Sequence, residues 1–187
     1  VVTNPKDTAA RQVMISKGQS LAESFNYMDT QLKLIQGNIG NEINVITGEA
    51  NSLLKQIADL NKQIQAVEPN GYMPNDLYDA RDTLVDQLNS FIPVSIEMVP
   101  SGGNALAIAE GSMTISFNGI TLVEADNYRK MQAQDSAGAP ITGDDTTKAF
   151  DKFGITEMKK ATGHEADEKV GPSDFSSETV EYDDLEA

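Results

Sequence analysis

The side chains that most often perform chemistry in proteins are sparse in this chain. Its 187 residues include no cysteine and a single histidine. His164 would be needed as a general base, a proton shuttle or an imidazole metal ligand, but it lies in an acidic stretch without an apolar pocket around it. A solvated histidine is the better interpretation. The absence of cysteine excludes a disulfide framework, a thiolate metal site and a cysteine nucleophile.

Three other stretches carry residue types that occur in binding sites. The pairs Asp144–Asp145 and Asp183–Asp184 lack the spacing of an EF-hand, which leaves loose binding of a divalent cation as the alternative to plain solvated charge. The stretch 101–104 (Ser-Gly-Gly-Asn) shares only its glycines with a phosphate-binding loop, and a strand pattern follows it. A hairpin turn is therefore the preferred interpretation, and we expect neither a cofactor nor a metal ion.

Asp79, Arg81 and Asp82 form a further candidate, because neighbouring carboxylates can act as catalytic acids. On a predicted helix they are more simply a charged face. Arg81 would then either pair with the aspartates or donate to backbone carbonyls. We therefore expect a structural role, in which Arg81 fixes the turn before its helix, and no catalytic activity.

One long apolar stripe organises the elements that would position any site. From Leu21 to Val67 apolar residues recur in steps of three and four, as they do on one face of an α-helix. The stripe comprises Leu21, Phe25, Met28, Leu32, Ile35, Ile39, Ile43, Ile46, Ala50, Leu53, Ile57, Leu60, Ile64 and Val67. Such a helix spans about 70 Å, whereas a compact chain of this size would be about 40 Å across. The pattern therefore predicts an elongated molecule built on this helix.

Glycines fall within the predicted helix. Gly37, Gly40 and Gly48 each cost about 1 kcal/mol relative to alanine. Two shorter helices that meet near Gly37–Gly40 are the alternative to one helix. The stripe keeps its face through the glycines, which favours a single helix over about 19–67. A preceding helical stretch, capped by Asp7 or Thr8, either continues into it or hinges at Gly18.

A second, shorter helix is predicted after the turn at 68–71. Asn75 or Asp76 suits its N-cap, and the helix covers about 76–91. Its expected apolar face consists of Leu77, Ala80, Leu84, Leu88 and Phe91. Alternation then predicts four short antiparallel strands, at 94–98, around Leu106 and Ile108, at 113–117 and at 120–124, with a hairpin at 118–119 (Asn-Gly).

The remainder of the chain carries weaker patterns. Residues 126–187 hold 15 acidic and 7 basic residues, and only 148–160 has weak helical spacing. We expect the end beyond about Gly163 to be mobile, because it has too few large apolar residues to offset the entropy of ordering. The chain is thus predicted to be mainly α with a small antiparallel β part. Residues 1–93 form an elongated helical-bundle rod, 94–127 a β-meander, and 128–187 an acidic variable segment that is disordered or begins an outer domain.

Charge and hydropathy exclude two classes of partner. The formal net charge is −15, so nucleic acid and anionic lipid are poor partners. No apolar run approaches the 18 or so residues that a membrane span needs. The first residues lack the basic and apolar regions of a cleavable signal peptide.

The segment PNDLYDARDTLVDQLN, residues 74–89, resembles the bacterial flagellar hook-associated protein 1 family. That family carries a P-N-D-L-x-D-x-R-D-x-L-V motif. The matching residues are Pro74, Asn75, Asp76, Leu77, Asp79, Arg81, Asp82, Leu84 and Val85. Residues 10–25, 57–64 and 121–123 are also similar to parts of the family, so the resemblance covers about 4–125.

This resemblance implies a structural subunit of the bacterial flagellum that polymerises at the hook–filament junction and is needed for motility. It implies export through the flagellar type III apparatus without a cleaved signal, and a dedicated export chaperone. The implied partners are the chain itself, the hook protein and the second junction protein. In the family, terminal helices from both chain ends complete the trunk, and we expect this chain to be an internal part of such a protein.

The residues agree with an assembly role. Each apolar residue of the stripe contributes about 1.5–3 kcal/mol when fully buried, and the helix at 76–91 is long enough to cover only part of it. The expected assembly residues are therefore Leu21, Phe25, Met28, Leu32, Ile35, Ile39, Ile57, Leu60 and Ile64, with the motif residues beside them. Two alternatives are a coiled-coil adaptor unrelated to flagella and an enzyme, such as a peptidoglycan hydrolase, attached to a flagellar protein.

Overall fold

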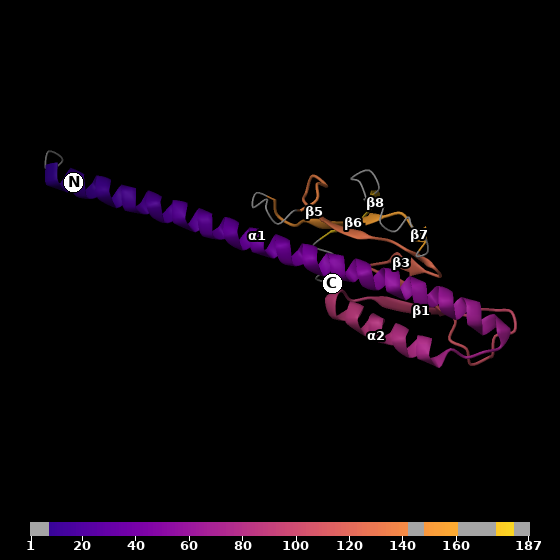
Figure 1. Ribbon diagram of the computed structural model, residues 1–187. Coiled ribbons are helices and arrows are strands. Elements are labelled where there is room, and N and C mark those ends of the chain that lie inside the picture. The colour runs from indigo at the N-terminus through magenta and orange to yellow at the C-terminus, as the bar shows by residue number, and fades with distance from the viewer. Residues whose placement is uncertain (1–7, 142–147, 161–174, 182–187) are drawn as a thin grey trace.

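The protein is a rod built on one long helix, which confirms the predicted mainly α fold with a small antiparallel β part (Figure 1). The computed structural model describes residues 8–141, 148–160 and 175–181. Helix α1 spans Thr8–Val67. Its first half projects alone, and the other elements gather around its second half (Figure 1). Among the described residues, no helix is long and apolar enough to cross a membrane.

The glycines of α1 do not interrupt the helix. Gly37 and Gly40 are both buried, and a Cβ atom on Gly40 would lie 3.1 Å from the side chain of Ile141. Gly40 therefore lets the strand region approach the helix closely. The alternative of two helices that meet near Gly37–Gly40 is wrong. The helix also begins at Thr8, earlier than the predicted start near residue 19, so the preceding stretch continues through Gly18.

A tight elbow joins α1 to the second helix. The 3₁₀ helix η1 (Glu68–Asn70) ends at Gly71, which has a left-handed backbone (φ 83°). Helix α2 spans Asn75–Phe91 and lies beside α1 (Figure 1). Pro74 occupies the cap position without a side-chain hydrogen bond, so the predicted caps at Asn75 and Asp76 are wrong.

The inward face of α2 also differs from the prediction. Its buried residues are Tyr78, Arg81, Val85 and Leu88. Of the predicted face, Leu77 and Leu84 are half-buried, while Ala80 and Phe91 are exposed. The face is rotated by about one residue, because α2 turns the polar side chains of Tyr78 and Arg81 inward.

The first sheet lies against the second half of α1. Its strands are β1 (Ser95–Val99), β2 (Ser112–Phe117), β3 (Ile120–Glu124), β4 (Asn127–Tyr128) and β7 (Lys159–Lys160), in that order and antiparallel. Asn118 and Gly119 form the predicted hairpin turn between β2 and β3, both with positive φ. The predicted strand around Leu106 and Ile108 is wrong. Strands β1 and β2 pair directly, from Val99 with Ser112 onward, so residues 100–111 form a loop with no strand partner.

A second sheet comprises β5 (Met131–Gln134), β6 (Lys152–Thr156) and β8 (Phe175–Glu181), in the order β5-β6-β8. The weak helical spacing at 148–160 was therefore misleading, because residues 152–156 form a strand. Strand β8 also falls within the segment that was expected to be mobile. His164, Asp144–Asp145 and Asp183–Asp184 lie outside the described residues.

Asparagine side chains of α1 hold both sheets by their backbones. Asn51 donates to the carbonyl of Met131 at 2.8 Å and accepts from its N–H at 2.7 Å. Asn61 pairs in the same way with Met113, at 2.7 and 2.9 Å, and donates to the carbonyl of Ala125 at 3.0 Å. These polar contacts accompany an aliphatic core in which Leu54, Ile57 and Leu88 are fully buried. They fix the position of each sheet along the helix.

Candidate interaction surface

A buried polar cluster fixes the elbow between α1 and α2. Glu68 is fully buried, and its carboxylate accepts hydrogen bonds from three groups. The Tyr78 hydroxyl and the Gly111 N–H, at 3.0 Å, both donate to Oε1, and the Ser101 hydroxyl donates to Oε2. Helix α2 and the loop 100–111 are thereby joined to η1 through one side chain.

Arg81 is the second charged centre of this cluster, and it is fully buried as well. Its Nη1 donates to the Gly111 carbonyl at 2.7 Å and to Asn61 Oδ1 at 3.3 Å. Its Nη2 forms an ion pair with Glu110 at 2.7 Å, and the guanidinium lies 5.6 Å from the centre of the Tyr78 ring. Arg81 thus ties α2 to both α1 and the loop.

Burial and hydrogen bonding shift the pKa values of two groups here. Burial alone would raise the pKa of Glu68, but the hydrogen bonds from Ser101, Tyr78 and Gly111, with the charge of Arg81, lower it below its ordinary value. Burial and the hydrogen bond to Glu68 raise the pKa of Tyr78 to about 12. The folded state therefore favours an anionic Glu68 beside a neutral Tyr78. Among the described residues, no group of three or more histidine, cysteine, aspartate or glutamate side chains could hold a metal ion.

The first half of α1 presents an exposed apolar stripe. Between 47% and 66% of the surface of each of its predicted assembly residues is exposed. These residues are Leu21, Phe25, Met28, Leu32, Ile35 and Ile39. Large apolar side chains exposed at this density are typical of interaction sites, so the predicted assembly residues stay a candidate surface.

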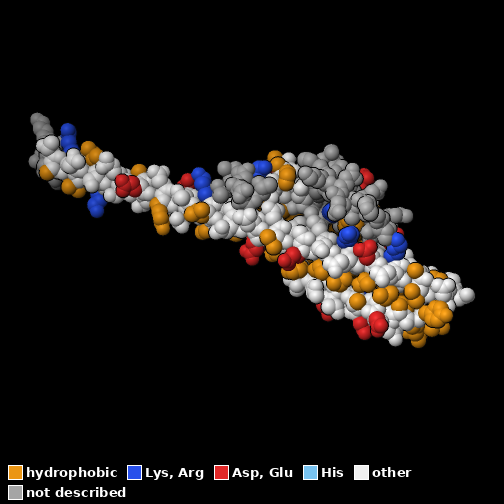
Figure 2. Space-filling view, viewed as in Figure 1, with side chains coloured by type: hydrophobic (Ala, Val, Ile, Leu, Met, Phe, Trp, Pro, Cys, Tyr) orange, Lys and Arg blue, Asp and Glu red, His pale blue; other side chains and the backbone are white. Residues whose placement is uncertain are grey.

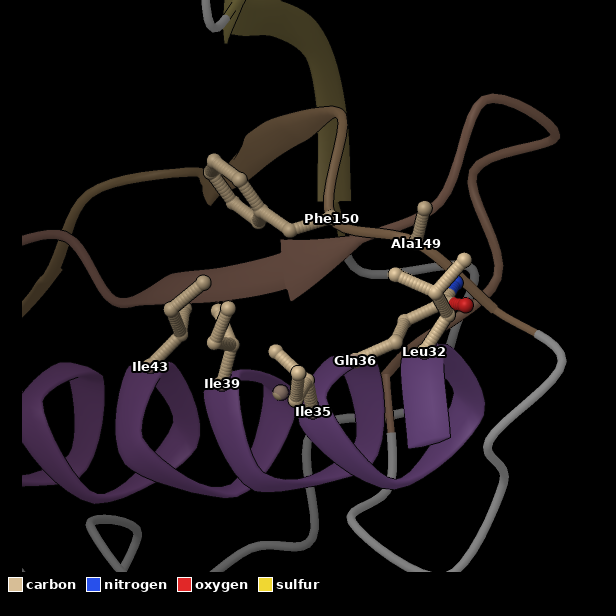
Figure 3. A pocket seen from close by; sticks show the side chains of 8 residues that line it. Leu32, Ile35, Gln36, Ile39, Ile43, Ala149 and Phe150 are labelled. Atoms are coloured by element: carbon tan, nitrogen blue, oxygen red, sulfur yellow. The ribbon is translucent and has the colours of Figure 1, made fainter. Parts of the chain in front are cut away.

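A pocket of about 360 Å³ lies at the inner end of this stripe. Leu32, Ile35, Ile39 and Ile43 of α1 form one wall, and Ala149 and Phe150 form the other. Figure 3 shows the three isoleucines pointing from α1 toward the segment that carries Phe150. The stripe is therefore continuous with an apolar recess under the second sheet.

Two shallow grooves follow the seam between α1 and α2. One is lined by Leu60, Ala80 and Leu84, and the other by Leu53 and Phe91, each among polar neighbours. Figure 2 shows hydrophobic side chains gathered over the end of the rod where the two helices meet. The helix pair thus leaves apolar surface open on its outer side as well.

The sequence model described as the helical domain of the flagellar hook-associated protein FlgK matches residues 1–162. The chain belongs to this family. The match covers most of the 187 residues, both helices and the strands up to β7, so the resemblance of residues 74–89 to the family is confirmed.

Named relatives agree with the family assignment. The chain is 47% identical over 112 residues to flagellar hook-associated protein 1 of Bacillus subtilis, which is 60% of this chain and 22% of that protein. It is 34% identical over 152 residues to the protein of the same name from Salmonella typhimurium, 80% of this chain and 26% of that protein. The chain therefore spans about a quarter of the length of these relatives.

A solved structure shows the same fold. The flagellar hook junction protein FlgK from Burkholderia pseudomallei aligns with a TM-score of 0.62 and 21% sequence identity. The alignment covers 93% of this chain and 28% of that chain.

Within this family fold, the motif residues separate into two groups. Arg81 is buried, whereas Asp79 and Asp82 are exposed on the outer side of α2. The ion-pair partner of Arg81 is Glu110 and not either aspartate, so a shared charged face is the wrong interpretation for Arg81. Of the other predicted assembly residues of α1, Ile57 and Ile64 lie in the core and Leu60 is half-buried.

Three members of the polar cluster were not predicted from the sequence. Asn61 and Glu68 are isolated polar residues within or just after the apolar stripe, and Tyr78 was not part of the predicted apolar face of α2. The one available signal was position: Asn61 lies four residues after Ile57 and three before Ile64, on the inward side. Nothing local distinguished Glu68 from a solvated helix-end residue.

Proposed function

We propose that the chain is the trunk of a structural subunit of the bacterial flagellum, which polymerises at the hook–filament junction and is needed for motility. The exposed apolar stripe on the first half of α1 is the observation that carries this proposal, together with the names of the family and of its relatives. A stripe of six large side chains, each about half exposed, supplies apolar surface that neighbouring helices can bury during assembly.

The partners follow from the same role. The subunit contacts further copies of itself and the neighbouring axial proteins, the hook protein and the second junction protein. It leaves the cell through the flagellar export apparatus with the help of a dedicated chaperone and without a cleaved signal, and it functions outside the cell. It has no catalytic activity and binds neither nucleic acid nor membrane. The coiled-coil adaptor is not favoured, because the family match includes strands as well as helices.

The proposal is tested in cells with the full-length protein. Leu32→Asp places a charge in the middle of the stripe, where the side chain is 66% exposed, so the fold itself should tolerate it. Loss of swimming and of filaments at the hook end, with normal amounts of exported subunit, is the expected result. Thr30→Asp is the matched control, since Thr30 is exposed on the opposite side of the same turns.

Normal motility with Leu32→Asp would contradict the proposal, as would an equal loss with Thr30→Asp. A purified chain that turned over cell-wall or peptide substrates above a heat-denatured control would contradict the absence of catalysis.

A further inference from the structure

The loop 100–111 at the elbow end of the rod is held by the buried polar cluster. The pairing of Val99 with Ser112 closes its base. Within the loop, Leu106 is 46% and Ile108 is 73% exposed, so the apolar side chains of its tip do not anchor it. Its attachment to the rest of the molecule must come from polar contacts.

Those contacts converge on two side chains. Ser101 and the Gly111 N–H donate to Glu68, while the Gly111 carbonyl and Glu110 accept from Arg81. A further link is the Asn104 N–H, which donates to the Pro69 carbonyl at 3.2 Å. Glu68 alone therefore supplies the acceptor for donors at both ends of the loop.

We propose that the carboxylate of Glu68 is an acid-sensitive clasp, which as an anion holds residues 100–111 on the elbow and as a neutral acid releases them while the helices stay folded. This device is independent of the proposed function. An anionic carboxylate accepts from all three of its donors at once and is attracted to Arg81. A neutral acid loses that attraction, and one oxygen becomes a donor.

The groups around Glu68 support this assignment. Tyr78 and Arg81 face it from α2, and Ser101 and Gly111 face it from the loop. Asn61 of α1 accepts a hydrogen bond from Arg81. The other carboxylate near Arg81 is Glu110, whose side chain is 37% exposed, so water can replace its partner. The lowered pKa of Glu68 agrees with this proposal in direction, because Glu68 then binds a proton more tightly when the loop is open than when it is closed.

The helices have a separate source of stability. The seam between α1 and α2 contains fully buried apolar residues such as Ile57 and Leu88, which do not titrate. Protonation of Glu68 therefore weakens the hold on the loop much more than it weakens the helix pair.

Amide hydrogen exchange of the purified chain tests the clasp. The Gly111 N–H reports on the loop directly because Glu68 is its acceptor, and the amides of Ile57 and Leu88 report on the helices. Between pH 7 and pH 3.5, corrected for intrinsic exchange, protection at Gly111 should fall by up to about 10-fold, because one pH unit below the ordinary glutamate pKa of 4.5 proton linkage allows a change of that size. Ile57 and Leu88 should stay more strongly protected than Gly111 at both pH values, because their amides exchange only when the helices themselves unfold.

Two variants identify the titrating group. Glu68→Gln keeps the shape without the charge, so Gly111 should be weakly protected already at pH 7 and show no acid step. Glu110→Gln should retain the acid step. Because the chain has no cysteine, a fluorophore on Ile108→Cys gives an independent readout of loop release.

The proposal is overturned if Gly111 keeps its full protection at pH 3.5, if Gly111 and Ile57 are equally protected at that pH, which would mean that the loop opens only when the helices unfold, or if Glu68→Gln retains the acid step. Should Glu68→Gln fail to fold by circular dichroism, the comparison of Gly111 with Ile57 in the unmodified chain decides alone.

Discussion

Arg81→Lys is the most direct test of the elbow, because it keeps the charge and removes the planar guanidinium. The guanidinium reaches Gly111 and Glu110 at 2.7 Å and Asn61 at 3.3 Å with two different nitrogens. A lysine has one nitrogen and cannot reproduce both arms of that fork. We therefore expect Arg81→Lys to lose at least one hydrogen bond that involves a charged group.

The magnitude follows from this count. Hydrogen bonds to charged groups contribute about 1.5–3 kcal/mol each, so the free energy of unfolding should fall by about that much. Arg81→Met removes every arm and leaves buried acceptors unpaired, which should cost about 3–5 kcal/mol. With a urea dependence of about 2 kcal/mol per molar, the midpoint for Arg81→Lys should fall by about 1 M.

The aspartates beside Arg81 provide matched controls. Asp79→Asn and Asp82→Asn change exposed residues of the same helix, so each should shift stability by less than about 0.5 kcal/mol. Urea unfolding followed by circular dichroism measures all four variants. An unchanged midpoint for Arg81→Lys would refute the reasoning, and so would an equal loss from either aspartate variant, because Arg81 would then depend on the aspartates.

Three further predictions concern pH, the two halves of α1 and the base of the loop. Because the pKa of Glu68 is lowered, its contribution to the free energy of unfolding should be complete above pH 4.5 and be lost as the pH falls through the pKa that Glu68 has in the folded state. Because the pKa of Tyr78 is raised to about 12, the contribution of Tyr78 should be lost as the pH rises from 10 through 12. Stability curves for Glu68→Gln and Tyr78→Phe should each lack the corresponding limb, and an unchanged acid limb in Glu68→Gln would contradict this. Leu60→Asp should lower the thermal midpoint of the isolated chain because Leu60 is half-buried against α2, whereas Leu32→Asp should leave the midpoint nearly unchanged. Equal losses would contradict this, because they would mean that the chain itself already covers Leu32. Gly111→Ala should destabilise the fold by more than the roughly 1–3 kcal/mol of an unfavourable backbone conformation, since the new Cβ would lie 2.0 Å from the Val99 carbonyl oxygen. Gly119 has a similar φ but open space around it, so Gly119→Ala should cost only the backbone strain. Equal losses in thermal melts would contradict a steric clash at Gly111.

The sequence predicted the elements that depend on local patterns. The long helix, the second helix and the β2–β3 hairpin follow from period and turn residues within a few positions of one another. The strand expected around Leu106 and Ile108 failed because alternation cannot reveal that β1 and β2 pair with each other directly. Strand β6 was missed because its partners, β5 and β8, lie far away in the chain.

The candidate site divides in the same way. Stripe residues such as Leu32 could be named from spacing, because an apolar residue in the stripe is either core or interface. Arg81 could be named only as a member of a motif. Its partners lie on α1 and in the loop 100–111, and sequence separation conceals those contacts.

The two halves of α1 show why burial cannot be read from a helix alone. Leu32 and Ile57 occupy equivalent places in one stripe, yet the first is 66% exposed and the second is fully buried. The difference arises entirely outside the helix, because α2 and the sheets cover only the second half (Figure 1). The buried charged residues, Glu68 and Arg81, lie at the elbow, where the direction of α2 is set, and the exposed apolar residues lie on the first half of α1. The polar contacts at the elbow specify one geometry, whereas an apolar stripe can pack against any helix of matching shape. A chain organised in this way has its own contacts concentrated where it turns and leaves apolar surface uncovered where another helix could pack.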